Sequence, residues 1–482
     1  MEAGLHDRLF HPHETTPAGP EPTLAGIVHL GLGAFFRAHV ASYISEAMQH
    51  HGGDWGVIGV SLKSPGVRDR LRPQGWAYTA VELAPDGEKP QVMTLLRDVL
   101  VAPENPQAVL DAMAAPTVSI VSLTVTEKGY CHEPATGRLD PAHPDIVHDL
   151  NHDLPNSAPG YLVRALQLRH ARGLPPFTVL CCDNLPENGH VVRGVMLDLA
   201  RLIDPALAAW IASNGAFPST MVDRIVPATT PDDLDRVAAL TGQRDEAPVM
   251  HEPFRQWVVE DRFCGARPQW EVAGAQMVAD VTPFEHMKLR MLNGTHSSLA
   301  YLGYLAGYQT IAEVMTDPAF VSYARHLWQS EIIPTLTPPE NTDLGAYAEA
   351  LAARYANPAI RHRTWQIAMD GSQKLPQRIL ATLAENRAAG RSSAGLVLAV
   401  AAWMRYTSGR DETGTAVEVK DPLADRLAAL WCDDPRDTVK GFLTLSEVFP
   451  KSLRQDSGFA AELTQALSGL VAQGARAVVA DI

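Results

Sequence analysis

The sequence predicts an α/β protein with two domains: a parallel-sheet domain over residues 1–282 and a mainly α-helical domain over residues 283–482. Apolar runs rich in β-branched residues alternate with helical patterns before Val281. After Pro283 the runs give way to segments rich in Ala and Leu, separated by turns that contain Pro or Gly. A length of 482 residues allows about two to four domains and a core that needs no disulfides.

Composition favours an ordinary globular enzyme in a reducing compartment. The net charge of −15, without a long basic run, argues against nucleic acid as a partner. Five cysteines form no CxxC pair, which is typical of a cytosolic protein. The chain lacks an apolar run of about 18 residues and a signal-peptide pattern, so we expect a cytoplasmic location and no membrane partner.

The first predicted strand, residues 27–30, leads into a glycine-containing turn and then into a helical pattern over 34–48. Strand, Gly31-x-Gly33 turn and helix are the context of a Rossmann-type dinucleotide site, where glycines let the backbone approach a pyrophosphate. The third glycine of the fingerprint is replaced by Phe36, and a simple tight turn is the alternative.

The second predicted strand, residues 55–62, leaves the choice of cofactor open. A carboxylate that binds the ribose hydroxyls is expected near its end. This chain has Lys63 and Arg68 there and no carboxylate. We expect NAD, and NADP is not excluded.

Two further buried strands are predicted over 117–126 and 177–182. Ligands of open α/β sheets lie beyond the carboxyl ends of the strands. Glu127, Lys128 and Asn184 follow these ends and are therefore candidates for a site. The alternative is that such residues only cap loops and helices, as Asp183 and Asn188 can.

Residues 285–308 have the pattern of a long helix whose first half carries polar groups among apolar ones. At about 100° per residue, Lys288, Asn293 and His296 fall within an arc of roughly 140°, with Glu285 inside it. Such a face could bind and polarise a small polar molecule, and the lysine could act as acid or base if burial lowers its pKa. Ordinary solvated polar groups are the alternative.

The rest of the chain predicts helices and a polar turn, without an internal repeat or a metal-ligand pattern. The helical segments are 311–315, 320–333, 344–354, 392–406, 424–430 and 459–474, and the polar turn is 370–376.

Six motifs together resemble the polyol-specific long-chain dehydrogenases, the mannitol dehydrogenase family. They are GLGAFFRAH, VSLTVTEKGYC, CCDNLPENGH, MVDRIVP, EPFRQWV and the spacing Lys288-x4-Asn293-x2-His296. The resemblance extends from about Gly26 to the last helices. It implies zinc-independent, NAD(P)-dependent hydride transfer in a cleft between a Rossmann-type domain and a helical domain.

The resemblance also implies roles for individual residues. Lys288 would be the acid/base, Asn184 and Asn293 would polarise the reacting oxygen, His296 would orient the substrate, and Glu285 would lie on the proton path. Asp223 and Lys374 match positions at the substrate end. The residues expected at the cofactor are Gly31, Gly33, Phe35, Arg37 and Glu127.

Within the family, the chain looks most similar to the fructuronate reductase branch. Lys128, Arg361 and Arg363 differ from the mannitol pattern, and cations near a site suit a carboxylate substrate. We expect at least one of the three to pair with that carboxylate. Arg290 also differs, but it projects from another side of the helix.

Three alternatives remain open at this stage. The substrate could be a sugar acid, as in fructuronate reduction to mannonate, or an uncharged ketose, as in a mannitol 2-dehydrogenase. A nucleotide-binding regulator that lost its chemistry is the non-enzymatic alternative. A monomer or a small homo-oligomer is expected.

Overall fold

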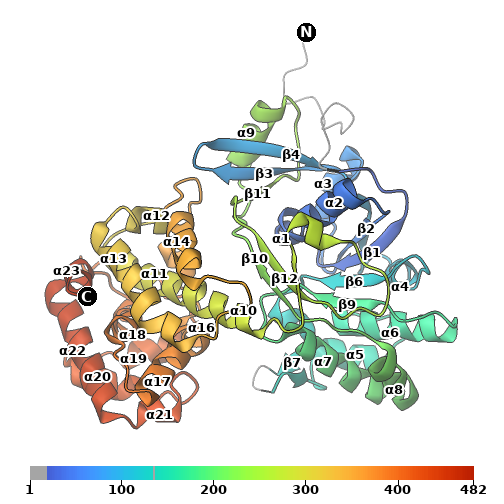
Figure 1. Ribbon diagram of the computed structural model, residues 1–482. Helices are drawn as coiled ribbons and strands as arrows, with labels where there is room; N and C mark the ends of the chain where they lie inside the picture. The colour runs from blue at the N-terminus through green and yellow to red at the C-terminus, as the bar shows by residue number, and fades with distance from the viewer. Residues whose placement is uncertain (1–18, 134–135) are drawn as a thin grey trace. The chain divides into compact units, whose positions relative to one another are not determined.

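The computed structural model describes residues 19–133 and 136–482, which form two compact units, Met1–Thr282 and Pro283–Ile482. Unit 1 contains a five-stranded parallel sheet with the order β5-β2-β1-β6-β9 (Figure 1). Its strands are β1 (Ala25–Leu30), β2 (Gly56–Ser61), β5 (Leu96–Val101), β6 (Ile120–Leu123) and β9 (Thr178–Cys181). The strand order reverses direction on either side of β1, as in a Rossmann-type domain, so the predicted fold class is confirmed.

The predicted strand 117–126 is shorter in the structure, because the chain leaves the sheet after Leu123. The Thr124 hydroxyl donates to the carbonyl of Gly31, at a distance of 2.8 Å, and so ties the end of β6 to the turn after β1. Residues beyond Leu123 therefore form a loop at the carboxyl edge of the sheet instead of the last three predicted strand positions.

Smaller sheets complete unit 1. They contain β3 (Tyr78–Ala84), β4 (Gly87–Met93), β7 (His132–Glu133), β8 (Arg138–Leu139), β10 (Thr220–Asp223), β11 (Val249–His251), β12 (Gln256–Glu260) and β13 (Gln276–Val278). The α-helices of this unit are α1 (Ala34–Ala38), α2 (Val40–His51), α3 (Gly66–Leu71), α4 (Pro106–Met113), α5 (Pro144–Asn151), α6 (Ala158–Ala171), α7 (Asn188–Ile203), α8 (Pro205–Asn214) and α9 (Pro231–Thr241).

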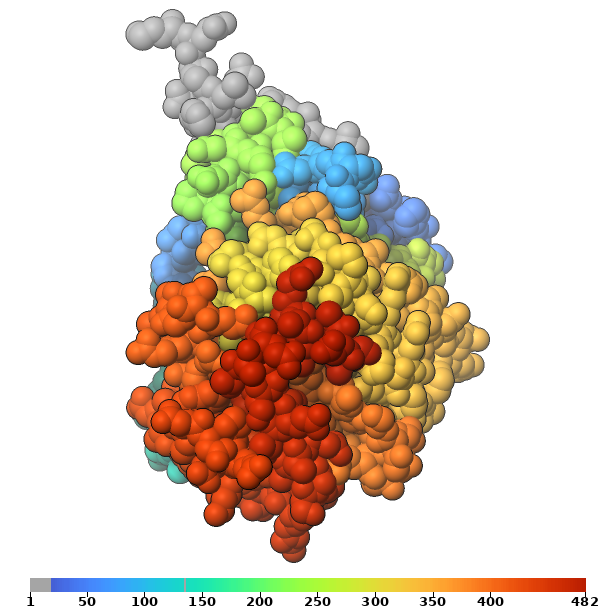
Figure 2. Space-filling model, turned by 90° about the vertical axis from the view of Figure 1, so that its left-hand side faces the viewer, coloured from blue at the N-terminus to red at the C-terminus, as the bar shows by residue number. Residues whose placement is uncertain are grey.

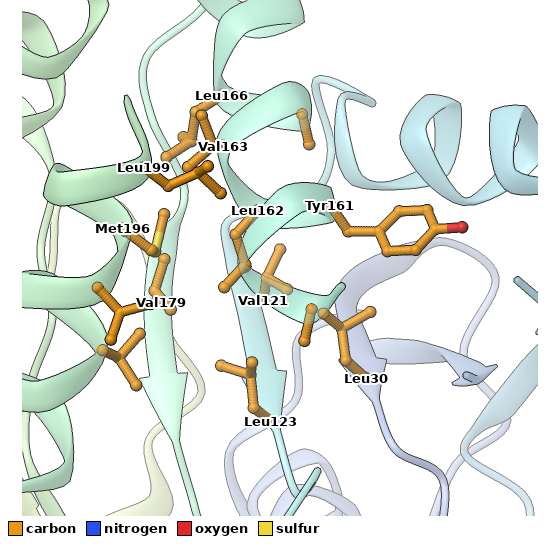
Figure 3. Packing of buried hydrophobic residues seen from close by; sticks show 14 of the residues in the cluster. Leu30, Val121, Leu123, Tyr161, Leu162, Val163, Leu166, Val179, Met196 and Leu199 are labelled. Carbon is orange, nitrogen blue, oxygen red and sulfur yellow. The ribbon is translucent and has the colours of Figure 1, made fainter. Parts of the chain in front are cut away.

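Helices α6 and α7 cover one face of the parallel sheet. Val121 and Leu123 of β6 and Val179 of β9 pack with Leu162 of α6 and Met196 of α7 in one buried cluster (Figure 3). All five side chains are almost completely removed from water, so this packing supplies much of the hydrophobic stabilisation of unit 1. It fixes the carboxyl edge of the sheet from which the site loops project.

Unit 2 is helical, as predicted. Its helices are α10 (Thr282–Met287), which begins at the boundary, α11 (Thr295–Leu305), α12 (Ile311–Val314), α13 (Pro318–His326), α14 (Leu344–Tyr355), α15 (Thr364–Ile367), α16 (Gly371–Leu375), α17 (Ala381–Ala388), α18 (Ala394–Tyr406), α19 (Ala424–Ala429), α20 (Pro435–Phe442), α21 (Lys451–Arg454), α22 (Ser457–Gln473) and α23 (Ala475–Ala480). Three π-helices join some of them: η6 (Lys288–Gly294), η7 (Leu327–Ile332) and η9 (Pro376–Leu380). The segment 370–376, predicted as a polar turn, is instead mostly the short helix α16.

Buried α11 and α18 pack against each other, and α22 and α23 cover them from outside. Figure 2 shows this C-terminal segment, in red, lying on the surface of the unit over the yellow helices. Among the residues described, no helix has the length and apolar character needed to cross a bilayer.

Candidate functional site

The turn after β1 depends on the absence of a side chain at Gly31. This residue has φ +90°, and a Cβ atom there would lie 2.2 Å from the carbonyl oxygen of Thr124. Gly33 differs, because a Cβ atom there would meet nothing closer than the Gly31 carbonyl oxygen at 3.7 Å. Gly33 is also exposed and precedes the first N–H groups of α1, which have no partner within that helix. The two glycines therefore differ in role: the turn requires Gly31, whereas Gly33 faces solvent.

A buried histidine joins the two strands at which the sheet order reverses. His29 of β1 makes hydrogen bonds with Ser122 Oγ and Thr124 Oγ1, both at 2.8 Å, and stacks on Phe36 with 3.7 Å between ring centroids. Burial lowers the pKa of His29 to about 3, so the ring is neutral. The ends of β1 and β6 are therefore held together where ligands bind in such sheets.

The loops after β6 and β9 are held by one carboxylate. Asp183 accepts hydrogen bonds from the backbone N–H groups of Val125 and Thr126 and from the hydroxyl of Tyr130. Burial raises the pKa of Asp183, and these three bonds oppose that shift. Thr126 has φ +67°, an uncommon conformation for a β-branched residue, so the loop that carries Glu127 and Lys128 is fixed in a strained shape.

A cavity of about 670 Å³ lies beside these loops in unit 1. Its walls come from the end of β2, the loop after β6 and the start of α6, and include Lys63, Thr126, Lys128 and Tyr161. Arg68 does not line it, because this residue pairs with Asp69 and Glu104. Of the two cations that left the cofactor choice open, only Lys63 thus borders the cavity.

The other residues expected at the cofactor are placed differently from one another. Phe35 is half-buried and stacks on His39, and Glu127 is exposed just after β6. Arg37 is buried inside unit 1, where its guanidinium donates to the carbonyls of Gly33 and Ala247. Arg37 therefore stabilises the turn from the interior of unit 1, a role that the sequence did not indicate. Contact of Phe35, Arg37 and Glu127 with the cofactor stays a prediction.

In unit 2, the helix predicted over 285–308 is interrupted by the π-helix η6, which changes the expected arc of polar groups. In a π-helix the hydrogen bond joins residues i and i+5. Lys288 and Asn293 are five residues apart, so they lie about one turn above each other, closer in angle than α-helical geometry predicts. Lys288 is buried and Asn293 is half-buried.

Side chains from other helices satisfy the carbonyls that the wide turn releases. The Trp328 indole N–H donates to the carbonyl of Met291 at 2.9 Å, and the Tyr355 hydroxyl donates to that of Leu292 at 2.7 Å. Gly294 allows a close approach of the chain, since a Cβ atom there would lie 2.6 Å from the carbonyl oxygen of Arg378. The π-helix is therefore stabilised by specific tertiary contacts.

His296, at the start of α11, lies in a buried cluster of rings and cations. It stacks on Tyr355 with 5.1 Å between centroids and meets His362 edge-on at 4.8 Å. Burial lowers the pKa of His296 well below its usual value, and His362, Arg378, Arg354 and Lys374 lower it further. The imidazole is thus neutral, and basic side chains that can interact with an anionic ligand lie around it.

Of the residues in unit 2 that we expect to bind substrate, some lie near His296 and others lie on the surface. Lys374 lies in α16 near His296 and His362, and its ammonium donates to the carbonyl of Met369. Arg361 and Arg363 are exposed. Arg290 is buried and paired with Glu385, so its role is structural, in keeping with its projection from another side of the helix.

The candidates in unit 1 lie on loops or at strand ends. Asn184 is exposed in the loop after β9, and Lys128 is exposed after β6. Asp223 is buried at the last position of β10, opposite Gln256 of β12. Glu285, in α10, is half-buried. The roles of these residues stay predictions.

Three side chains in unit 1 lie close enough together to hold a metal ion, but their contacts indicate a structural role. Cys131, His143 and Asp145 place one ligand atom each within 4.8 Å of one another. However, the His143 ring accepts a hydrogen bond from the N–H of Asp145 and thereby caps α5. Burial and the nearby Asp145 raise the pKa of the Cys131 thiol to about 12, which disfavours the thiolate that a metal would need.

The sequence missed the partners of His296. Tyr355, Arg354 and Arg378 lie on helices that are distant in sequence, and His362 stands between Arg361 and Arg363, far from His296 along the chain. A histidine between two arginines was the one signal that the sequence offered.

The chain matches both domains of one family. The models for the mannitol dehydrogenase Rossmann domain and C-terminal domain match residues 25–272 and 280–471, respectively. The chain is 49% identical over 463 residues to D-mannonate oxidoreductase of Escherichia coli (strain K12), covering 95% of both proteins. It is 41% identical over 463 residues to a mannitol 2-dehydrogenase of Phaeosphaeria nodorum, covering 95% of this chain and 81% of that one. The solved structure of Pseudomonas fluorescens mannitol 2-dehydrogenase, a ternary complex with NAD and D-mannitol, is similar with a TM-score of 0.84 and 37% identity, covering 98% of this chain and 96% of that one.

Proposed function

The chain belongs to the mannitol dehydrogenase family, and we propose that it catalyses the NAD-dependent, reversible reduction of D-fructuronate to D-mannonate. The choice of substrate depends on one observation. The chain is 49% identical to a D-mannonate oxidoreductase over 95% of both chains, compared with 41% identity to a mannitol 2-dehydrogenase. The basic side chains around His296, namely Arg354, Lys374 and Arg378, support a substrate with a carboxylate.

The residues of unit 1 fit a dinucleotide. The turn at Gly31 and Gly33, the first N–H groups of α1, which have no partner within that helix, and the cavity beside Lys63 are features that a dinucleotide uses in such folds. NAD supplies or accepts the hydride when it is bound.

The remaining chemistry belongs to the protein. During reduction, negative charge develops on the carbonyl oxygen, and amide donors from Asn293 and Asn184 stabilise it. Lys288 gives the proton to that oxygen, Glu285 exchanges the proton with solvent, and neutral His296 orients the substrate. Asn293 suits its role because its side-chain amide makes no hydrogen bond within the described residues and remains available to a ligand.

A comparison of substrates tests this proposal. With NADH, kcat/KM for D-fructuronate should exceed that for D-fructose by at least about tenfold, because a charge-assisted hydrogen bond stabilises a complex by about 1.5–3 kcal/mol. A clear preference for D-fructose would instead identify a mannitol 2-dehydrogenase-type enzyme. Absence of NADH oxidation with either substrate would favour a nucleotide-binding regulator.

A further inference from the structure

His362 is the one residue of the run Arg361–Arg363 whose side chain meets the buried cluster around His296. Its ring lies edge-on to that of His296, at 4.8 Å between centroids and an interplanar angle of 65°. Arg361 and Arg363, on either side, are exposed. His362 is itself half-buried, so it differs in exposure from the arginine on each side.

The backbone at His362 is fixed from both sides. Its N–H donates to the carbonyl of Ile360 at 2.9 Å, and its carbonyl accepts from the N–H of Ile311 at 3.1 Å. The next residue, Arg363, bridges to Thr310 in an isolated antiparallel pair. The anchored backbone and the ring contact with His296 together pre-organise the His362 side chain, which is the property that a specificity-determining residue needs.

The Nδ1 atom of His362 is buried and has no hydrogen-bond partner among the residues that the structure describes. Buried polar atoms in native proteins are nearly always satisfied, and an exception indicates either a functional role or a missing partner such as a ligand. Lys374 lowers the proton affinity of both His362 and His296, and Arg378 and Arg354 act on His296. An acceptor with negative charge is therefore the ligand group that this environment favours.

We propose that His362 determines the specificity for sugar acids, with its Nδ1–H donating a hydrogen bond to the carboxylate of the substrate bound beside His296. A carboxylate only accepts hydrogen bonds, which requires the tautomer with the proton on Nδ1. The inference rests on the proposed function. His362 takes the place of Arg361 and Arg363 as the first candidate for binding the carboxylate.

The test compares charged and uncharged substrates in two variants. In His362→Ala, kcat/KM for D-fructuronate should fall about ten- to a hundredfold, mostly through KM, while kcat/KM for D-fructose changes less than about threefold. His362→Asn should recover part of the loss, because its amide can donate in place of the imidazole N–H. His51→Ala, which removes an exposed histidine at the end of α2, is the matched control and should behave as wild type.

Equal losses on both substrates, or unchanged kinetics with D-fructuronate, would overturn the inference and leave His362 as a packing residue. Thermal melting of each variant separates a lost contact from a damaged fold.

Calorimetry on the NAD-loaded enzyme distinguishes this failure from failure of the proposed function. A wild-type enzyme that does not reduce D-fructuronate refutes the proposed function. The inference then stands only if D-mannonate binds and His362→Ala weakens that binding at least about tenfold while sparing D-mannitol. Absence of D-mannonate binding, or equal binding by both proteins, overturns it.

Discussion

Lys288 is a buried lysine at the first position of the π-helix η6, one π-turn before Asn293. We expect Lys288→Ala to lower kcat by about 10²–10⁴, the contribution of general acid–base assistance, with little change in the dissociation constant of NADH. Stopped-flow turnover and fluorescence titration of NADH measure the two effects. Near-normal turnover would remove Lys288 from the mechanism.

Asn293 offers an amide that the protein itself does not use within the described residues. Asn293→Ala should reduce the rate of hydride transfer by about 10²–10³ and change KM much less, because a donor aimed at a developing oxyanion acts mainly in the transition state. Single-turnover measurements at saturating substrate report that rate directly. A change confined to KM would contradict the assignment and make Asn293 a ground-state binding residue.

At the scale of single residues, sequence reasoning reached Lys288, Asn293 and His296 but not the residues around them. The three lie within nine positions of one helical pattern, so their spacing could be read directly. Tyr355, His362 and Arg378 come from three other segments, and only the packed structure shows that they surround His296. Long-range neighbours of this kind leave no local pattern.

At the scale of the elements, the turn between β1 and α1 contains two glycines whose roles an experiment can distinguish. Gly31→Ala should lower the melting temperature by several degrees or prevent folding, because its Cβ atom would lie 2.2 Å from the Thr124 carbonyl oxygen and φ is +90°. Gly33→Ala should keep the melting temperature and weaken NADH binding, because its Cβ atom has space in the protein but faces the ligand side.

Thermal melting and NADH titration of both variants decide the point. If Gly33→Ala bound NADH as tightly as wild type, the pyrophosphate would not approach this turn. A stable Gly31→Ala protein would show that the loop after β6 can move away from the turn.

The π-helix explains why the predicted element was right in position but not in geometry. Apolar periodicity indicates a helix and cannot distinguish an α-turn from a π-turn. The choice depends on Trp328 and Tyr355, which satisfy the carbonyls of Met291 and Leu292 from other helices. Similarly, β6 ends earlier than its β-branched run because the Thr124 hydroxyl bonds to Gly31.

For the whole molecule, the sequence predicted the order of a parallel-sheet half and a helical half, because the change in composition near Pro283 is abrupt. It did not predict how many buried histidines the fold would keep neutral. Among the residues described, burial lowers the pKa of six histidines from 6.5. The pKa falls to about 3 for His29, His39 and His251 and to about 4 for His362, it lies well below 6.5 for His296, and it is also lowered for His132.

These histidines should make the protein labile to mild acid. Each has a lower pKa in the folded state, so unfolding takes up protons below pH 6.5, and stability falls as pH decreases from 6.5 towards 4. The raised pKa values of Asp183, Asp245, Glu331 and Glu412 act in the opposite direction, but among the described residues these carboxyls are fewer than the histidines. We therefore expect the melting temperature, measured by scanning fluorimetry at constant ionic strength, to fall steadily between pH 6.5 and 4.5.

His362→Asn removes one titrating group, worth up to about 1.4 kcal/mol per pH unit, and should flatten this dependence of the melting temperature on pH. A melting temperature that stayed level or rose on acidification would mean that these rings are protonated in the folded protein.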